Sequence, residues 1–166
     1  MAAATQISLA EYLNTDYSPD VDFVDGATVD RNVGKRKHSR MQSRLARYLD
    51  AAGLDPSKEV LVEQRVRVAE TRVRVPDICV ADRNEDEILT APPDLCVEIL
   101  SPDDRWSRIQ TQIQEYLAFG VPMVWIIDPY TNEAWAATSL QIQPIMDGVL
   151  RCPSLGLELS LTEIFG

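Results

Sequence analysis

The sequence of 166 residues contains no hydrophobic run that approaches the roughly 18 residues a membrane-spanning helix needs. Its first residues lack the basic segment and the apolar core of a secretory signal peptide. Internal repeats, low-complexity tracts and interdomain linkers are also missing. These absences predict a cytoplasmic protein with no membrane partner, folded as a single domain over residues 1–166.

Cysteine is scarce, and its spacing excludes two further classes of protein. The three cysteines show no C-x-x-C spacing, so neither a zinc site nor a disulfide framework is indicated. Cys79 and Cys96 lie within apolar runs, where we interpret them as small buried hydrophobic residues. The glycines form neither a P-loop nor a dinucleotide-binding pattern.

Positive charge is scarce overall but concentrated in one part of the chain. The net charge is −10, yet residues 31–74 hold 12 of the 16 Lys and Arg against 5 acids. This segment could present a basic face to a polyanion such as nucleic acid. The alternative is an asymmetrically charged but simply solvated surface.

The hydrophobic periodicity predicts an α/β (α+β) fold with a mixed central sheet flanked by helices. A helix and hairpin occupy residues 1–33, a helix-strand-strand-strand-helix-strand core occupies 34–130, and a strand and turn extension occupies 131–166. The predicted core elements are a helix from 34 or 35 to about 52, strands at about 59–68, 71–81 and 94–100, a helix starting at Ser101 or Asp103 and ending at Phe119, and a buried strand in "PMVWIIDP". Asp103 and Asp104 are expected to lie in the acidic first turn of the second helix.

Two of the predicted strands each carry one acid in an apolar context, Asp77 in "VPDICV" and Glu98 in "LCVEIL". Burying a carboxylate costs several kcal/mol unless something compensates its charge. If the two strands are neighbours, both side chains can point to one spot, where a cation such as Mg²⁺ would relieve their repulsion. The backbone carbonyl of Ile99 could add an oxygen ligand. In the alternative interpretation, Asp77 caps a turn after Pro76 and Glu98 pairs with an arginine.

Four motifs, in this order and spacing, resemble one family of proteins. They are "DFVDGATVDRNVGKRKHSRMQSRLARYL", "VEQRVRVAETRVRVPDICV", "PPDLCVEILSPDDR" and "EYLAFGVPMVWIIDP", which together span about residues 20–130. The chain is similar to the PD-(D/E)XK nuclease superfamily, and within it to the Uma2 (Uma-two) family of restriction endonucleases. The resemblance implies a restriction-endonuclease-like core and a Mg²⁺- or Mn²⁺-dependent endonuclease. It further implies DNA as the substrate, with RNA as the alternative, and a homodimer is plausible because two copies can cut both strands.

The resemblance also assigns roles to individual residues. It implies that Asp77 and Glu98 bind the metal ion and that Ile99 contributes its carbonyl. In this family a lysine that activates the attacking water usually lies four residues before the tyrosine of "Y-x-x-x-G-V". That tyrosine is Tyr116 here, and position 112 is Gln.

The change from lysine to Gln112 leaves two functions open. Gln112 can orient a water molecule by hydrogen bonding, but it carries no charge and cannot exchange a proton as lysine can. Arg108 could supply charge without a proton, and another lysine, Lys35, Lys37 or Lys58, could reach the site instead. Otherwise the chain is a catalytically degenerate member that acts as a nucleic-acid-binding or protein-binding module.

Several other residues are accessory candidates. His38, the only histidine, is either a surface or capping residue or a neighbour of the scissile phosphate or metal ion. Glu63 is either a salt-bridge partner of the surrounding arginines or a third acid near the metal. The strand arginines form either a phosphate-binding face or a solvated sheet face. The predicted nucleic-acid-binding residues are Lys35, Arg36, Lys37, Arg40, Arg65, Arg67 and Arg74.

Overall fold

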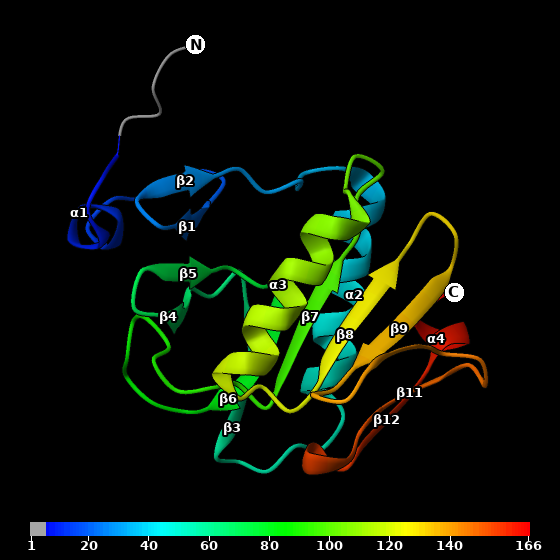
Figure 1. Cartoon of the computed structure of the whole chain (residues 1–166). Coiled ribbons are helices and arrows are strands. Elements are labelled where there is room, and N and C mark those ends of the chain that lie inside the picture. Colours follow the sequence, from blue (N-terminus) through cyan, green and yellow to red (C-terminus); the bar gives the residue numbers. More distant parts are fainter. Residues whose placement is uncertain (1–5) are drawn as a thin grey trace.

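A six-stranded mixed sheet forms the centre of the molecule, seen in Figure 1 in a computed structural model that describes residues 6–166. Its strands are β3 (Lys58–Val62), β6 (Ile78–Asp82), β7 (Leu95–Ile99), β8 (Val124–Asp128), β9 (Glu133–Ala137) and β10 (Ile142–Pro144). They are arranged in the order β10-β9-β8-β7-β6-β3, and only the β7–β8 pair is parallel. Because β7, β8 and the helix between them form a parallel crossover, two of the most buried strands lie side by side at the middle of the sheet.

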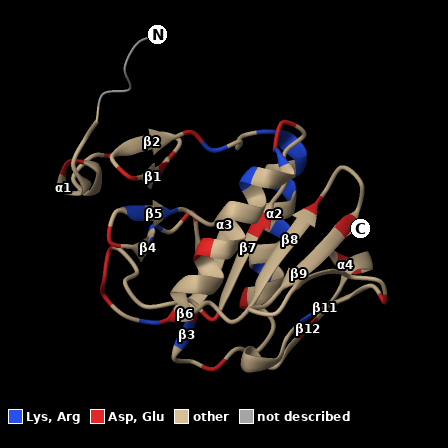
Figure 2. Ribbon diagram, in the orientation of Figure 1, with Lys and Arg blue, Asp and Glu red and all other residues tan. Residues whose placement is uncertain are grey.

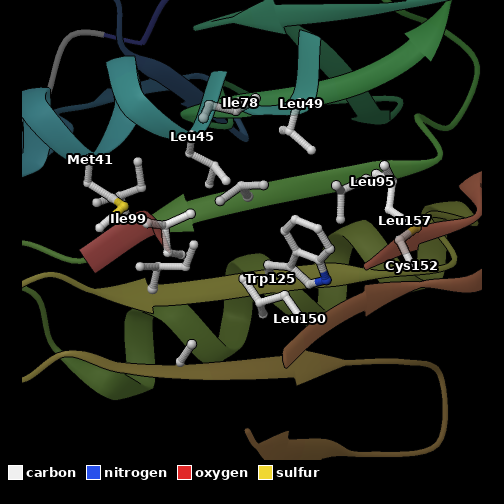
Figure 3. Close-up of a cluster of buried hydrophobic side chains, with 14 of the residues drawn as sticks. Met41, Leu45, Leu49, Ile78, Leu95, Ile99, Trp125, Leu150, Cys152 and Leu157 are labelled. Carbon is white, nitrogen blue, oxygen red and sulfur yellow. The ribbon is translucent and has the colours of Figure 1, made fainter. Parts of the chain in front are cut away.

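Two long helices cover the two faces of this sheet. The helix α2 (Arg36–Asp50) packs Met41, Leu45 and Leu49 against one face, together with the side chain of Trp125 from β8 (Figure 3). The helix α3 (Trp106–Phe119) covers the opposite face. Strand alternation sends Cys96 toward α3 and its neighbours Leu95 and Val97 toward α2, so both faces are apolar.

A second, smaller sheet lies beside the central one. It contains β1 (Asp22–Val24), β2 (Ala27–Val29), β4 (Val66–Ala69) and β5 (Arg72–Arg74) in the order β2-β1-β5-β4. The short helix α1 (Leu9–Leu13) packs Tyr12 against Phe23 of this sheet. At the other end of the chain, the hairpin β11 (Val149–Cys152) and β12 (Leu157–Ser160), with the 3₁₀ turn Pro153–Leu155 between its strands, leads into α4 (Leu161–Phe165).

Most of the predicted elements are confirmed. The amino-terminal helix and hairpin, the helix near residues 35–52, the strand near 94–100, the buried strand in "PMVWIIDP" and a strand and turn within 131–166 all occur. The strand carrying Glu98 is indeed the neighbour of the strand after Asp77. Cys79 and Cys96 are free and buried, which confirms their interpretation as small buried residues, and Cys152 is free and buried as well.

The prediction of two long strands at 59–68 and 71–81 is wrong. Each is divided, because Glu63 adopts a positive φ of 53° and ends β3, while Pro76 separates β5 from β6. The segment between these breaks leaves the central sheet, and β5 pairs with β1 instead. Periodicity of two residues continues across both breaks, so it could not reveal them.

The predicted start of the second helix is also wrong. α3 begins at Trp106, with Arg105 as an N-cap residue that makes no side-chain capping bond and no acid in its first turn. Asp104 is engaged elsewhere: its Oδ2 accepts the Ser101 N–H at 2.7 Å and its Oδ1 accepts Nδ2 of Asn32 at 2.6 Å. Residues 101–105 therefore form a loop, and the acids predicted for the first turn lie in it.

Within residues 6–166, no helix combines the length and the apolar character that crossing a membrane requires.

Candidate active site

The two acids singled out in the sequence face each other across the β6–β7 pair. Ile78 pairs with Val97 in antiparallel register, so Asp77, which immediately precedes β6, lies opposite Glu98. Both residues are buried, with 3% of Asp77 and 8% of Glu98 exposed. They line one small cavity of about 20 Å³, room for about one water molecule or ion. The structure therefore brings together the pair that the sequence places 21 residues apart.

Asp77 is held through both carboxylate oxygens. Its Oδ2 accepts the backbone N–H of Ile99 at 2.7 Å, and its Oδ1 accepts a hydrogen bond from Nη2 of Arg31 at 3.0 Å. The Nε2 atom of His38 lies 3.2 Å from the same Oδ1. These contacts fix the orientation of the carboxylate and compensate its charge.

Glu98 is held on one side only. Its Oε1 accepts a hydrogen bond from the hydroxyl of Tyr116 at 2.6 Å. Burial raises the pKa of Glu98 well above its usual range, and the charge of Asp77 raises it further. The bond from Tyr116 and the charge of Arg31 oppose this shift without cancelling it. Glu98 therefore keeps its proton to a higher pH than an exposed glutamate does.

Arg31 is the principal site residue that the sequence analysis missed. Only 6% of its side chain is exposed. Burial lowers the pKa of Arg31, but the charges of Asp77, Glu98 and Glu63 outweigh burial and leave that pKa above its ordinary value. The guanidinium group therefore stays charged inside the cavity. No local signal in the sequence separates Arg31 from the other members of the basic segment.

Gln112, the residue at the position where the family usually has lysine, lies on the buried face of α3 and in the wall of the cavity. Its Nε2 donates to Oδ2 of Asp22 at 3.2 Å. Asp22 also accepts from Nη1 of Arg74 at 3.0 Å and from the Val75 N–H at 2.9 Å. Asp22 was missed as well, although it shows the signal that identified Asp77: an acid between apolar residues in a strand.

The remaining accessory candidates take different positions. His38 is 1% exposed and lines the cavity, so it is a site residue rather than a surface residue. Arg108 lines the cavity and donates to the Asp30 carbonyl. Glu63 does not line it, but lies 3.9 Å from Nη1 of Arg31 and so acts as a distant salt-bridge partner. Ile99 lines the cavity beside Asp77.

None of the three lysines of the chain lines the cavity. The Nζ atom of Lys35 lies 2.5 Å from Asp103, and Nζ of Lys37 lies 5.1 Å from the ring centroid of Tyr130. Lys58 pairs with Asp82 and Asp94, each at 2.7 Å. The alternative that Lys35, Lys37 or Lys58 reaches the site is therefore not realised among the described residues that line the cavity. Among the described residues, the cations at the cavity wall are the guanidinium groups of Arg31 and Arg108.

The predicted nucleic-acid-binding residues divide into two groups. The first is exposed and lies in or just before the first turns of α2, where Figure 2 shows a concentration of basic residues: Lys35, Arg36, Lys37 and Arg40.

The second group lies on β4 and its neighbours and is largely engaged within the protein. Arg74 is buried between Asp22 and Glu115. Arg65 is paired with Asp20 at 2.8 Å and lies over the ring of Tyr12. Arg67 is half-buried and donates to the Glu70 carbonyl. Arg65 and Arg74 cannot contact a phosphate backbone while these pairs persist, because the paired carboxylates occupy their guanidinium groups.

The donor atoms at the cavity suit a hard divalent cation under one condition. Two carboxylates and a nearby carbonyl are the oxygen ligands that Mg²⁺ or Mn²⁺ accepts, with water and substrate completing the shell. Within the described residues, no cluster of three or more His, Cys, Asp or Glu forms a ready-made metal cage. The condition is that Arg31 moves away from Oδ1 of Asp77, because the contacts of Arg31 and His38 already take up both lone pairs of that oxygen and the charge of Arg31 repels a metal ion.

Comparisons with known proteins agree with this architecture. A family model, Uma2, described as "Putative restriction endonuclease", matches residues 9–162. A crystal structure at 1.96 Å resolution, described as that of "a putative nuclease belonging to DUF820" from Anabaena variabilis ATCC 29413, is 26% identical with a TM-score of 0.83. The alignment covers 96% of this chain and 97% of that chain. None of the curated proteins compared with the chain matches it. The matched region includes β6, β7 and α3, which position the cavity residues.

Proposed function

Because the chain belongs to the Uma2 family of restriction-endonuclease-like proteins, we propose that it is a Mg²⁺- or Mn²⁺-dependent endonuclease acting on DNA. The observation that carries this proposal is the opposition of Asp77 and Glu98 across the β6–β7 pair at one cavity. Two buried acids so placed repel each other and reduce stability, so this arrangement indicates a functional site. Binding a catalytic cation is such a function.

In this proposal Asp77, Glu98 and the carbonyl of Ile99 would hold the cation. When bound, a divalent cation supplies Lewis acidity toward a phosphate and lowers the pKa of a bound water. Gln112, fixed by Asp22, orients the attacking water through its side-chain amide. Arg108 and the exposed basic residues at the start of α2 bind the phosphate backbone.

The proposed function is tested by incubating supercoiled plasmid with the purified protein and Mg²⁺ or Mn²⁺. We expect nicking by the wild type, a loss of roughly 10²-fold or more in Glu98→Gln, and no nicking when EDTA is added. The assay also includes Gln112→Lys, which restores the lysine that the family usually has at this position. Gln114→Lys is its matched control, because Gln114 lies on the exposed face of the same helix, α3. Wild-type nicking that survives unchanged in Glu98→Gln would contradict the proposal.

A second candidate function is a binding module that has lost catalysis. The observation that favours it is the absence of any lysine at the cavity, with Gln112 in the position where the family usually has one. In that case the wild type binds DNA without cutting it, and Gln112→Lys restores nicking while Gln114→Lys does not. The same plasmid assay therefore separates the two functions.

The proposal extends to the assembly of the protein. Two copies related by a two-fold axis would present two cavities to the two strands of a duplex. Sedimentation of the protein with and without a short duplex measures whether this homodimer forms.

A further inference from the structure

Arg31 differs from the other buried arginine of the chain in how its charge is compensated. Arg74, whose side chain is also 6% exposed, lies between two carboxylates: Nε is 2.5 Å from Glu115 and Nη1 is 3.0 Å from Asp22. Arg31 has one close carboxylate, Asp77, and a second, that of Glu63, only at 3.9 Å. Its ion pairing is therefore incomplete.

The unpaired nitrogen of Arg31 is unique in the part of the chain that the structure describes. Among residues 6–166, Nη1 of Arg31 is the only buried side-chain nitrogen or oxygen without a hydrogen-bond partner. Leaving such a donor unsatisfied in the interior destabilises the protein, because the donor has lost its hydrogen bonds to water without replacing them. An arginine in this state is held more weakly than its burial suggests, because leaving the cavity would restore its missing hydrogen bonds.

The main chain that carries Arg31 is fixed by hydrogen bonds to other segments, whereas its guanidinium makes, among the described residues, a single side-chain hydrogen bond, to Asp77. Residues 30–35 form no helix or strand, but Asn32 donates to Asp104 at 2.6 Å and Ser101 Oγ donates to the Asn32 carbonyl at 2.5 Å. The Asp30 carbonyl accepts from Arg108. The segment is thus attached to the loop before α3 and to α3 itself. A change of Arg31 side-chain rotamer can then empty the cavity without unfolding this segment.

We propose that Arg31 is an internal competitor for the metal position: its guanidinium neutralises Asp77 in the metal-free protein, and a divalent cation binds only by displacing it. This inference rests on the proposed function, since it assumes that Asp77 and Glu98 are metal ligands. Arg31 then sets the affinity of the site. At low metal concentration it compensates the charge of Asp77 beside Glu98. It also raises the metal concentration at which the site becomes occupied.

The test is calorimetric titration of Mn²⁺ into the wild type, Arg31→Gln and Arg47→Gln. Arg47→Gln removes the same charge from an exposed position on α2 and controls for the change in net charge. We expect Arg31→Gln to bind Mn²⁺ roughly tenfold or more tightly than the wild type, because the metal ion no longer has to break the charge-assisted hydrogen bond between Arg31 and Asp77. Arg47→Gln should bind as the wild type does.

Thermal unfolding in EDTA and in Mn²⁺ provides a second measurement in case Arg31→Gln is unstable. Without Arg31 the two acids repel more strongly, so Mn²⁺ should raise the melting temperature of Arg31→Gln more than that of the wild type. Arg31→Lys, which keeps the charge, should bind Mn²⁺ less tightly than Arg31→Gln.

The outcomes separate this inference from the proposed function. Equal or weaker Mn²⁺ binding by Arg31→Gln, with binding retained by the wild type, would overturn the competition and leave the metal site intact. Absence of Mn²⁺ binding by all variants, including Arg31→Gln, would overturn both.

Discussion

At the scale of single residues, the two acids of the cavity are stabilised to very different degrees. Asp77 accepts hydrogen bonds at both oxygens and has Arg31 beside it, whereas Glu98 accepts one hydrogen bond, from a neutral tyrosine. The same substitution of acid by amide should therefore have opposite effects on stability at the two positions. This contrast does not depend on which metal ion or substrate the site binds.

Glu98→Gln should stabilise the metal-free protein, and more so as the pH rises. The pKa of Glu98 is raised by burial and by Asp77, so the unfolded chain loses this proton near the ordinary value of 4.5 while the folded protein retains it to higher pH. Above pH 4.5 the folded state binds more protons, and wild-type stability falls as the pH rises through that window. Gln keeps an oxygen for Tyr116 and lacks this titration. Denaturation in EDTA should show a gain of about 1–3 kcal/mol at pH 8 and less at pH 5. A gain that shrinks with rising pH would contradict this explanation.

Asp77→Asn should destabilise the protein by about 3 kcal/mol, the usual effect of breaking a buried ion pair. Asparagine offers one acceptor where Asp77 serves two donors, so either the Ile99 N–H or Arg31 loses its partner. The measurement is urea denaturation in EDTA at pH 7. Equal stability of Asp77→Asn and the wild type would show that Arg31 does not depend on Asp77.

At the scale of elements, the cavity residues are positioned by β7, by α3 and by the break before β6. β7 and α3 position Glu98 and Gln112, and the break at Pro76 places Asp77 just before β6. The small sheet is joined to these segments through Arg74 of β5, which contacts Asp22 of β1 and Glu115 of α3. Because Asp22 also holds Gln112, this ion-pair cluster connects the small sheet to the wall of the cavity.

Arg74→Met should therefore be strongly destabilising, by about 3–5 kcal/mol, because it leaves the buried Asp22 and the mostly buried Glu115 without their cation. Arg67→Met is the matched control. Arg67 is half-buried on the adjacent strand and contacts only a backbone carbonyl, so its loss should change the free energy of unfolding by about 0.5 kcal/mol or less. Similar losses in both variants would show that the cluster has no special role.

The sequence could predict those parts of the site that follow strand periodicity. Asp77 and Glu98 stand out as acids in apolar strands, whereas Gln112 was identified only through the resemblance to the family, by its place four residues before Tyr116. The division of the strands at Glu63 and Pro76 was missed, because alternation continues through both breaks. Arg31 was missed because it reaches the cavity from a segment without regular structure, and only tertiary contacts bring it to Asp77. The late start of α3 was missed because Ser101 and Asp104, good capping residues, bind each other and Asn32 instead.

At the scale of the whole molecule, a net charge of −10 coexists with an exposed basic surface at the start of α2, formed by Arg36, Lys37 and Arg40. None of these three residues forms a salt bridge within the part of the chain that the structure describes. Figure 2 shows a concentration of Lys and Arg on α2, while Asp and Glu are spread over many elements. The helix carries His38 into the cavity from its first turn, so the basic surface adjoins the candidate site.

If this surface binds DNA, the double substitution Arg36→Gln with Arg40→Gln should weaken binding equally for unrelated sequences. It should also reduce the slope of log affinity against log salt concentration by about 2, one for each lost phosphate contact. Fluorescence anisotropy with a labelled duplex, in the Glu98→Gln background to prevent cutting, measures both quantities. Arg83→Gln is the control, because Arg83 is exposed just after β6, at the end of that strand farther from Asp77. An unchanged slope in the double variant would place the DNA elsewhere.

The central claim is that Asp77 and Glu98 together bind a divalent cation. Its most direct test is a crystal structure of the protein grown with Mn²⁺, with anomalous scattering used to locate the metal. The account predicts one Mn²⁺ within about 2.5 Å of a carboxylate oxygen of each acid, with the Arg31 guanidinium turned away from Asp77. A structure in saturating Mn²⁺ with no anomalous peak at these carboxylates, and with Arg31 still bound to Asp77, would contradict it.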